Sequence, residues 1–240
     1  RYISVTGVQT CALPISKWNQ LLELLTTTHQ SDMPILHVIG GETLVQPGFY
    51  KTIKWLADNG YSKKFELRLT TSLAVNLTND ILEAIRSFRV VCLNLSIDSV
   101  GDNYHYVRWP ARFEKIEKNL DIIANFDHPK KIVIIQPLLS INNVFYFDKF
   151  VDYFGQMNNV PIRPIYLHNP ASLDVTNLPA PYRKHAADYL ERVLAKECLS
   201  NQPALKLYIE SIVQNLKLDQ VTDTGAFVTY LKYKIGRAHV

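Results

Sequence analysis

Short apolar runs that alternate with amphipathic helical patterns constrain the fold of this chain more than any other feature. Runs that predict strands begin at Ile35, Phe65, Val90, Lys131 and Ile162, and apolar residues at helical spacing follow the first four of them. This order favours a parallel sheet with right-handed crossovers. We therefore expect an α/β fold built as a barrel, whole or partial, and C-terminal helices after residue 170.

The expected elements have limits that a structure can test. Strands are expected to end at Gly40-Gly41, at Thr70-Thr71-Ser72 and at Ile97, and two later ones to span Lys131–Leu138 and Ile162–Leu167. Pro161 and Pro164 suggest that the last is an edge or irregular strand. The stretch from Ser99 to Pro110 is expected to be a polar loop. Helices are expected near residues 18–25, 49–59, 78–88, 110–123, 147–154, 182–197 and 204–216. Thr78 is expected to cap the third of these, and Asn142 or Asn143 the fifth.

The bulk composition excludes several classes of protein. With 240 residues, 47% of them hydrophobic and 20% charged, the chain can bury one substantial core. The net charge of +4 comes from scattered basic residues, which gives no case for nucleic acid as a partner. No apolar run is long enough to cross a bilayer. Three cysteines far apart favour a reducing, cytoplasmic compartment and indicate no self-contained metal site.

The two ends of the chain do not read as parts of the fold. Residues 5–16, VTGVQTCALPIS, and 234–240, KIGRAHV, both resemble the translation of one widely used sequencing adapter, read in opposite senses. We therefore expect 1–16 and 234–240 to be artefactual ends that complete no sheet or site, flanking a piece of a longer protein. On this view the strand at Ile35 has lost its neighbour, and its open apolar edge is an aggregation hazard.

Polar residues stand where the expected strands end. They are Gly40-Gly41-Glu42, Thr70-Thr71-Ser72, Ser96 with Asp98, Gln136, and Tyr166 with His168. In parallel barrels the sites lie at the carboxyl ends of the strands, so these residues predict a binding mouth. The alternative is that strand ends are polar because loops are solvated.

The glycine pair and Glu42 form the most specific of these strand ends. Glycine has no side chain to hold a ligand away from the backbone, so carbonyl groups there are accessible. Together with the Glu42 carboxylate they would suit a small cationic group such as an ammonium. A tight strand-to-helix turn is the simpler interpretation of the same residues.

Three segments in order resemble the radical S-adenosylmethionine enzymes. They are GGETL at 40–44, LTTS at 69–72 and LSIDSVGDNYHYVR at 95–108. The likeness is greatest to the twitch and SPASM-like members, and residues 170–184, PASLDVTNLPAPYRK, are similar to their exit from the barrel. The resemblance covers residues 17–196. It implies a partial (β/α)6, TIM-like barrel over 17–169 and a truncated C-terminal helical extension over 170–233.

The resemblance also implies roles for particular residues. Gly40, Gly41 and Glu42 would hold the methionyl ammonium of S-adenosylmethionine, which carbonyls and a carboxylate suit. Ser96 and Asp98 would face the ribose and the methionyl portion. Arg108 would pair with the methionyl carboxylate, although a solvated loop arginine is an equally good interpretation. Leu167 would lie against the adenine. No catalytic residue and no metal ligand is assigned.

The sequence also departs from the family pattern. The family commonly has proline where this chain has Thr43, an asparagine where it has Thr71, and glycine where it has Ser99. The CxxxCxxC loop that holds a 4Fe–4S cluster is absent, and its place would precede Trp18. Cys92 and Cys198 cannot replace it and are most simply small buried hydrophobic residues.

The function implied is that of an interior piece of a radical enzyme, inactive by itself. In the intact protein a 4Fe–4S cluster, fed by an electron donor, would cleave S-adenosylmethionine to a 5′-deoxyadenosyl radical. That radical would take hydrogen from a peptide or small-molecule substrate. Two alternatives stay open. One is a non-catalytic barrel that binds a nucleoside or amino-acid ligand or scaffolds a partner. The other is a conventional hydrolase or lyase, which lacks a convincing nucleophile and base.

Overall fold

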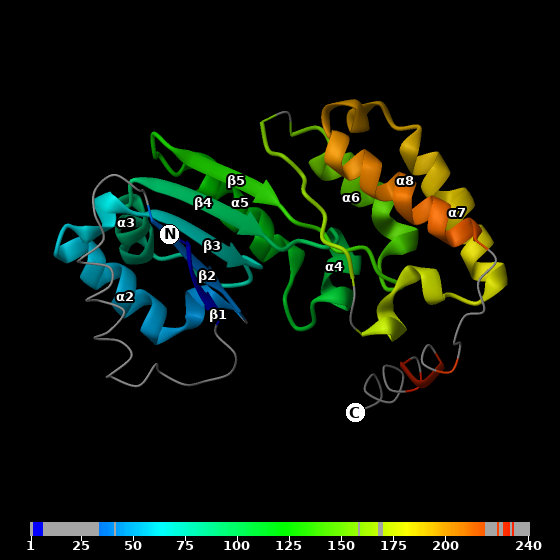
Figure 1. Ribbon diagram of the computed structural model, residues 1–240, viewed down its shortest axis with the longest axis horizontal. Coiled ribbons are helices and arrows are strands. Elements are labelled where there is room, and N and C mark those ends of the chain that lie inside the picture. Colours follow the sequence, from blue (N-terminus) through cyan, green and yellow to red (C-terminus); the bar gives the residue numbers. More distant parts are fainter. Residues whose placement is uncertain are drawn as a thin grey trace. The chain divides into compact units, whose positions relative to one another are not determined.

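The computed structural model describes residues 2–6, 34–40, 42–157, 159–167, 170–218, 225, 228–230 and 232. These residues belong to two compact units (Figure 1). Unit 1 comprises Arg1–Ser96 and Glu114–Ile134, and unit 2 comprises Ile97–Phe113 and Ile135–Val240. The helix expected near residues 18–25 lies outside the described residues, and the division expected at residue 170 stays a prediction.

The sheet confirms the expected parallel arrangement. Its strands are β1 (Tyr2–Thr6), β2 (Ile35–Ile39), β3 (Glu66–Thr71), β4 (Val90–Leu95) and β5 (Lys131–Ile135), in the order β1-β2-β3-β4-β5. The pairs β1–β2, β2–β3 and β3–β4 are all parallel. Figure 1 draws β5 beside β4 with its arrow in the same direction. The carboxyl ends of these parallel strands therefore lie at one edge of the sheet.

Helices follow the strands of unit 1 as the apolar spacing predicts. They are α2 (Pro47–Asp58), α3 (Asn79–Arg86) and α5 (Phe113–Asn125), with the 3₁₀ turns η1 (Thr43–Val45) and η2 (Tyr61–Lys64). Thr78 caps α3 as expected, since its hydroxyl accepts from the Ile81 amide at 3.4 Å. Gly60 follows α2 with a φ of 73°, a conformation that favours glycine, and this ends the helix.

One face of the sheet is apolar and lies under the helices. Leu69 and Leu93 share a small internal space with Ile85 of α3, with Ile123 of α5 and with Phe126, which directly follows α5. Because side chains alternate along a strand, the residues between them point to the opposite face. The core of unit 1 therefore lies between one side of β3 and β4 and the helices.

The opposite face of β3 is polar. Glu66, Arg68 and Thr70 alternate with the buried leucines of this strand. Arg68 Nη2 forms an ion pair with Glu66 Oε1 at 2.6 Å. The reason is visible in the sequence, because the alternation of Phe65, Leu67 and Leu69 leaves every second position to a polar residue.

Unit 2 is mostly helical. Its elements are α4 (Gly101–Val107), α6 (Phe147–Phe154), α7 (Ala180–Leu194) and α8 (Pro203–Lys217), with the 3₁₀ turns η3 (Val144–Tyr146), η4 (Ala171–Leu173), η5 (Val175–Asn177) and η6 (Glu197–Asn201). Figure 1 shows α7 beside α8. Phe147, Phe150 and Phe154 are fully buried and stack along α6, so the aromatic pattern marks a core.

Two predictions about strands are wrong in detail. The strand from Lys131 ends at Ile135, not at Leu138, because Pro137 has no amide to continue the ladder. Ile162–Leu167 is not a strand, and only Ile162 and Ile165 make isolated parallel bridges, to Ile135 and Leu138. Pro161 lies directly before the first of these residues and Pro164 lies between the two, and neither has an amide to donate to a ladder.

Three predictions about segments between strands also differ from the structure. Gly101–Val107, expected as a loop, is the helix α4, and its one buried side chain is Tyr104. A single apolar anchor in so short a helix leaves no period to detect. No Asn142 or Asn143 side chain caps α6, because Asn143 is engaged elsewhere. The helix expected from Pro110 begins at Phe113.

The N-terminal end contributes a strand, against expectation. Tyr2–Thr6 pairs in parallel with β2, with Val5 opposite Val38. The sequence YISVT is rich in β-branched and aromatic residues, which suit any open sheet edge regardless of their origin. The described part of β2 therefore has no open edge, and the expected aggregation hazard at that edge is not present in this structure. Residues 7–16 and 234–240 lie outside the described residues.

Candidate functional site

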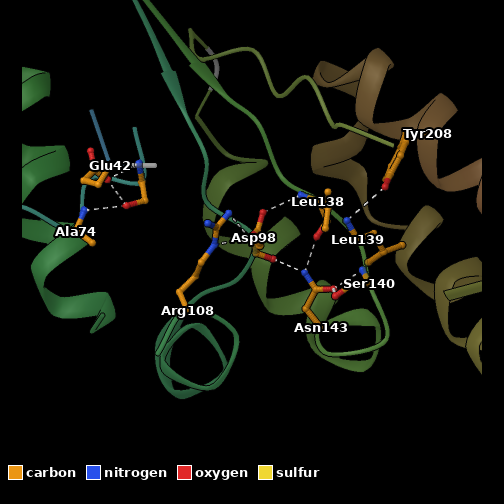
Figure 2. A network of polar contacts seen from close by, with 10 residues as sticks. Glu42, Ala74, Asp98, Arg108, Leu138, Leu139, Ser140, Asn143 and Tyr208 are labelled. Atoms are coloured by element: carbon orange, nitrogen blue, oxygen red, sulfur yellow. Dashed lines mark hydrogen bonds and ion pairs between the residues drawn. The ribbon is translucent and has the colours of Figure 1, made fainter. Parts of the chain in front are cut away.

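The Glu42 carboxylate is fixed at the carboxyl end of β3. Its Oε1 accepts from the Thr71 hydroxyl at 2.6 Å, and its Oε2 accepts from the Ser72 amide at 3.0 Å and the Ser72 hydroxyl at 2.5 Å. Oε1 also accepts from the Leu44 amide at 3.4 Å, which caps η1. Every partner is a donor, so the arrangement suits an ionised carboxylate. Figure 2 draws Glu42 with part of this network.

Thr43 fastens the glycine turn to the same strand end. It is buried, and its hydroxyl lies 3.3 Å from the Gly40 carbonyl oxygen and 3.2 Å from that of Thr70. Gly40 has a φ of 124°, a conformation that a residue with a Cβ rarely adopts. The departure from proline at position 43 therefore has a local purpose here. Gly41, which was predicted to share the site, lies outside the described residues.

Ser96 lies at the adjoining strand end of unit 1. Its amide donates to the Thr71 carbonyl at 2.8 Å, directly after the last residue of β4. Thr71 thus contacts both Glu42, through its hydroxyl, and Ser96, through its carbonyl. The structure therefore brings two of the predicted site residues, Glu42 and Ser96, to one residue, Thr71, at the carboxyl edge.

In unit 2, Asp98 and Arg108 form an ion pair. Arg108 Nε donates to Asp98 Oδ2 at 2.6 Å, and its Nη2 lies 2.5 Å from the same oxygen. The Asp98 side chain is 5% exposed and the Arg108 side chain 36%. Burial raises the pKa of Asp98, although Arg108 and the Leu138 amide both act to lower it. The resemblance assigned these two residues to different parts of S-adenosylmethionine and did not predict that they pair.

Asn143 and Leu138 hold the Asp98 segment from the other side. Asp98 Oδ1 accepts from the Leu138 amide at 3.0 Å. The Asn143 side-chain amide donates to the Asp98 carbonyl at 2.7 Å and to the Leu138 carbonyl at 2.8 Å. Its Oδ1 accepts from the Ser140 amide at 2.7 Å, so the fully buried Asn143 side chain is satisfied (Figure 2).

The predicted site residues therefore fall into two described groups. Gly40, Glu42 and Ser96 belong to unit 1, and Asp98 and Arg108 belong to unit 2. Their convergence on one cavity stays a prediction. Leu167 is half-buried, its contact with an adenine stays a prediction, and His168 lies outside the described residues.

Sequence reasoning missed Leu138 and Asn143, and it placed Thr71 and Ser72 at the strand ends without predicting that they hold Glu42. For Thr71 and Ser72 a signal existed, since three hydroxyl residues follow the strand at Leu69. For Asn143 the sequence offered only its place before an expected helix, which favoured a capping role that the structure does not support.

The described residues offer no ligand set for a metal cluster. Cys92 is buried in β4 with its thiol 3.9 Å from Asn94 Oδ1, and the Cys198 thiol lies 3.7 Å from the Val151 carbonyl. No group of three or more His, Cys, Asp or Glu residues in the described ranges could hold a metal ion. These residues therefore do not fit a 4Fe–4S cluster. Within the same ranges no helix has the length and apolarity needed to cross a membrane.

Comparisons with known proteins bear on the fold. No model of a protein family matches the chain, and no curated protein matches it at a significant level. Native anSMEcpe with bound AdoMet and Kp18Cys peptide gives a TM-score of 0.49 at 13% identity, over 73% of this chain and 49% of that one. SuiB of Streptococcus suis bound to its precursor peptide SuiA gives 0.48 at 12% identity, over 82% and 46%.

SuiB of Streptococcus suis bound to S-adenosylmethionine gives a TM-score of 0.51 at 11% identity, over 78% of this chain and 43% of SuiB. The chain thus spans about half the length of the solved structures that it matches. An identity this low carries information on the fold alone. The parallel sheet with its helices is shared with SuiB, and the predicted α/β class with a partial barrel is confirmed.

Proposed function

We propose that this chain is part of a radical S-adenosylmethionine enzyme. In the whole protein, S-adenosylmethionine would be cleaved reductively to a 5′-deoxyadenosyl radical, which takes hydrogen from a peptide or small-molecule substrate. An electron donor and a 4Fe–4S cluster would take part. Because the described residues do not fit that cluster, the roles of this chain are confined to binding and orienting S-adenosylmethionine.

The observation that carries this proposal is the Glu42 carboxylate, fixed at the carboxyl ends of β2 and β3 beside the Gly40 turn. A preorganised carboxylate next to accessible backbone carbonyls is a suitable partner for an ammonium group. The motif order of the sequence supports the identity of the ligand, and the fold shared with SuiB supports the barrel.

In this proposal the ion pair in unit 2 serves the other end of the amino acid. Asp98 takes Arg108 Nε and Nη2, which orients the guanidinium, and the planar fork of Arg108 would receive the methionyl carboxylate. Ser96 would face the ribose. In this proposal Asp98 acts on the ligand only through Arg108. The resemblance had implied that Asp98 would itself face the ligand.

The test is a titration of S-adenosylmethionine into the protein, with binding measured by saturation-transfer NMR and by calorimetry. Glu42→Gln removes the charge and places an amide donor against the Thr71 and Ser72 donors. Charge-assisted hydrogen bonds contribute about 1.5–3 kcal/mol, so affinity should fall roughly 10- to 100-fold. Gly41→Val should also weaken binding, because the added side chain blocks the approach of the ammonium.

Thr71→Val is the matched control for Glu42→Gln. It removes one hydrogen bond to the carboxylate and loosens the same strand end, but it leaves the negative charge in place. Its affinity should stay within about threefold of the parent, by the modest net value of one hydrogen bond. Equal affinity in the parent and Glu42→Gln would refute the ligand assignment.

A second measurement separates the enzyme from a binding protein. A longer form of the protein that carries a three-cysteine loop and a reconstituted cluster would be treated with a strong reductant and S-adenosylmethionine. Formation of 5′-deoxyadenosine would support the radical enzyme. Tight binding without that product would favour the non-catalytic alternative.

A further inference from the structure

The C-terminal helix α8 contacts the loop that follows β5 through the hydroxyl of Tyr208. This hydroxyl accepts from the Leu139 amide at 3.3 Å and donates to the Ile165 carbonyl at 3.1 Å. Burial raises the pKa of Tyr208, so the hydroxyl keeps its proton at neutral pH and can make both contacts. Leu139 directly follows Leu138, whose amide donates to Asp98 (Figure 2).

A second contact fixes α8 to the same segment of backbone. Gln202, the residue before α8, accepts from the Ile162 amide at 2.9 Å and donates to the Val160 carbonyl at 3.1 Å. Ile162 and Ile165 are the two residues that pair with the β5 region through isolated bridges and not through a regular strand. Helix α8 therefore supplies, through two side chains, the support that a regular neighbouring strand would otherwise give.

The far end of α8 is also restrained. The buried Arg183 of α7 donates to the Leu216 carbonyl from Nε at 3.3 Å and from Nη2 at 3.2 Å. A cation at the end of a helix satisfies carbonyls that have no partner within the helix. The helix that carries Tyr208 is thus held at both ends.

From this chain of contacts we infer that Tyr208 is a positioning residue, which sets the Leu138–Leu139 backbone and through it the Asp98–Arg108 pair. The link to ligand binding rests on the proposed function, in which Arg108 receives the methionyl carboxylate. Tyr208 touches no ligand itself. The C-terminal helices would then be a working part of the site and not an appended domain.

Tyr208→Phe removes the hydroxyl and little else, so the fold should persist. The matched control is Tyr189→Phe in α7 of the same unit. Its half-buried hydroxyl donates to Asp148 Oδ1 at 2.5 Å and accepts from the Asp148 amide at 3.1 Å, away from the Asp98 contacts. Both substitutions delete one tyrosine hydroxyl that makes two hydrogen bonds, so a general loss of stability affects both.

The first readout is amide hydrogen exchange at Leu138 and Leu139. In Tyr208→Phe the Leu139 amide loses its acceptor, and exchange at both amides should quicken about tenfold. The second readout is the carboxyl ¹³C titration of Asp98. A looser Leu138 amide lowers the pKa of Asp98 less, so the titration should move to higher pH. Tyr189→Phe should leave both readouts unchanged.

The third readout is the affinity for S-adenosylmethionine, which should fall roughly 2- to 10-fold in Tyr208→Phe only. Unchanged exchange, or equal changes in both variants, would overturn the positioning role. If the parent binds S-adenosylmethionine, faster exchange in Tyr208→Phe together with an unchanged affinity for S-adenosylmethionine would also overturn the positioning role. If the parent does not bind, the proposed function fails, and the exchange and titration readouts still decide whether Tyr208 positions Asp98.

Discussion

The two members of the Asp98–Arg108 pair should contribute unequally to stability, because they are unequally buried. Arg108→Met leaves a carboxylate that is 5% exposed without its cation, whereas Asp98→Asn leaves an arginine that is 36% exposed. An arginine so placed can turn its guanidinium towards water, but the carboxylate cannot leave its site. The arginine substitution should therefore be the more damaging of the two.

The magnitudes follow from the burial of what is left behind. Removing one partner of a buried ion pair costs about 3–5 kcal/mol of stability. Because Arg108 is partly exposed, Arg108→Met should cost about 3 kcal/mol, at the lower end of that range. Asp98→Asn loses a charge-assisted hydrogen bond but keeps an acceptor for the Leu138 amide, for a cost of about 1–2 kcal/mol. Replacing both residues should cost less than Arg108→Met alone, since no unpaired charge stays buried.

The difference should also depend on pH, with a sign that the burial of Asp98 dictates. Burial raises the pKa of Asp98 above its ordinary value of 3.8. The native state then holds this proton more tightly than the unfolded state, so stability falls as pH rises from about 3.8 to the native pKa. Arg108 acts to lower the native pKa of Asp98, so its removal raises that pKa and extends to higher pH the range over which stability falls. The penalty of Arg108→Met should therefore be larger at pH 7 than at about pH 4.5.

Urea unfolding followed by circular dichroism, at pH 4.5 and pH 7, would measure these differences. Each variant would be compared with the parent at the same pH, so that other titrating groups cancel. Equal costs for the two single substitutions would refute the argument from burial. A penalty for Arg108→Met that does not change with pH would refute the argument from charge.

Four further substitutions test packing and buried hydrogen bonds. Gly155→Ala should cost about 2–4 kcal/mol of stability, because the added Cβ would lie 2.4 Å from the Val151 carbonyl oxygen. Gly48→Ala, whose added Cβ would have nothing within 4 Å, should instead stabilise α2 by about 0.5–1 kcal/mol. Thermal melts compare the two variants, and equal melting temperatures would contradict the steric argument. Asn119→Leu should cost about 2–3 kcal/mol by orphaning two buried carbonyls, and chemical denaturation would expose a smaller value as an error in that reasoning. Arg183→Met should quicken hydrogen exchange at the end of α8 before it changes elsewhere, and a uniform change would speak against a local clamp.

Much of the fold could be predicted because its elements are long or strongly periodic. The strand from Val90 is buried on both faces, so its apolar run ends within two residues of the prediction. Helix α7, expected from Tyr182, begins at Ala180. The helix α4 was missed because Tyr104 alone anchors it, and a single buried residue defines no period.

The site was predictable in residue type but not in partnership. Glu42 was expected at a strand end, but its partners Thr71 and Ser72 are chosen by the register of β2 against β3, which sequence spacing does not reveal. The pairing of Asp98 with Arg108 depends on the turn of α4, which had been predicted as a loop. A missed helix thus hid an ion pair.

The polar face of β3 has a consequence for the heat capacity of unfolding. Exposing apolar surface raises the heat capacity by about 0.45 cal/K/mol per Å², whereas exposing polar surface lowers it by about 0.26. A parallel strand is usually apolar on both faces, but Glu66, Arg68 and Thr70 take one face of this one. Unit 1 should therefore gain less heat capacity per residue than an apolar barrel of its size. Its stability would then vary less steeply with temperature, which leaves the polar rim in place over a wider thermal range.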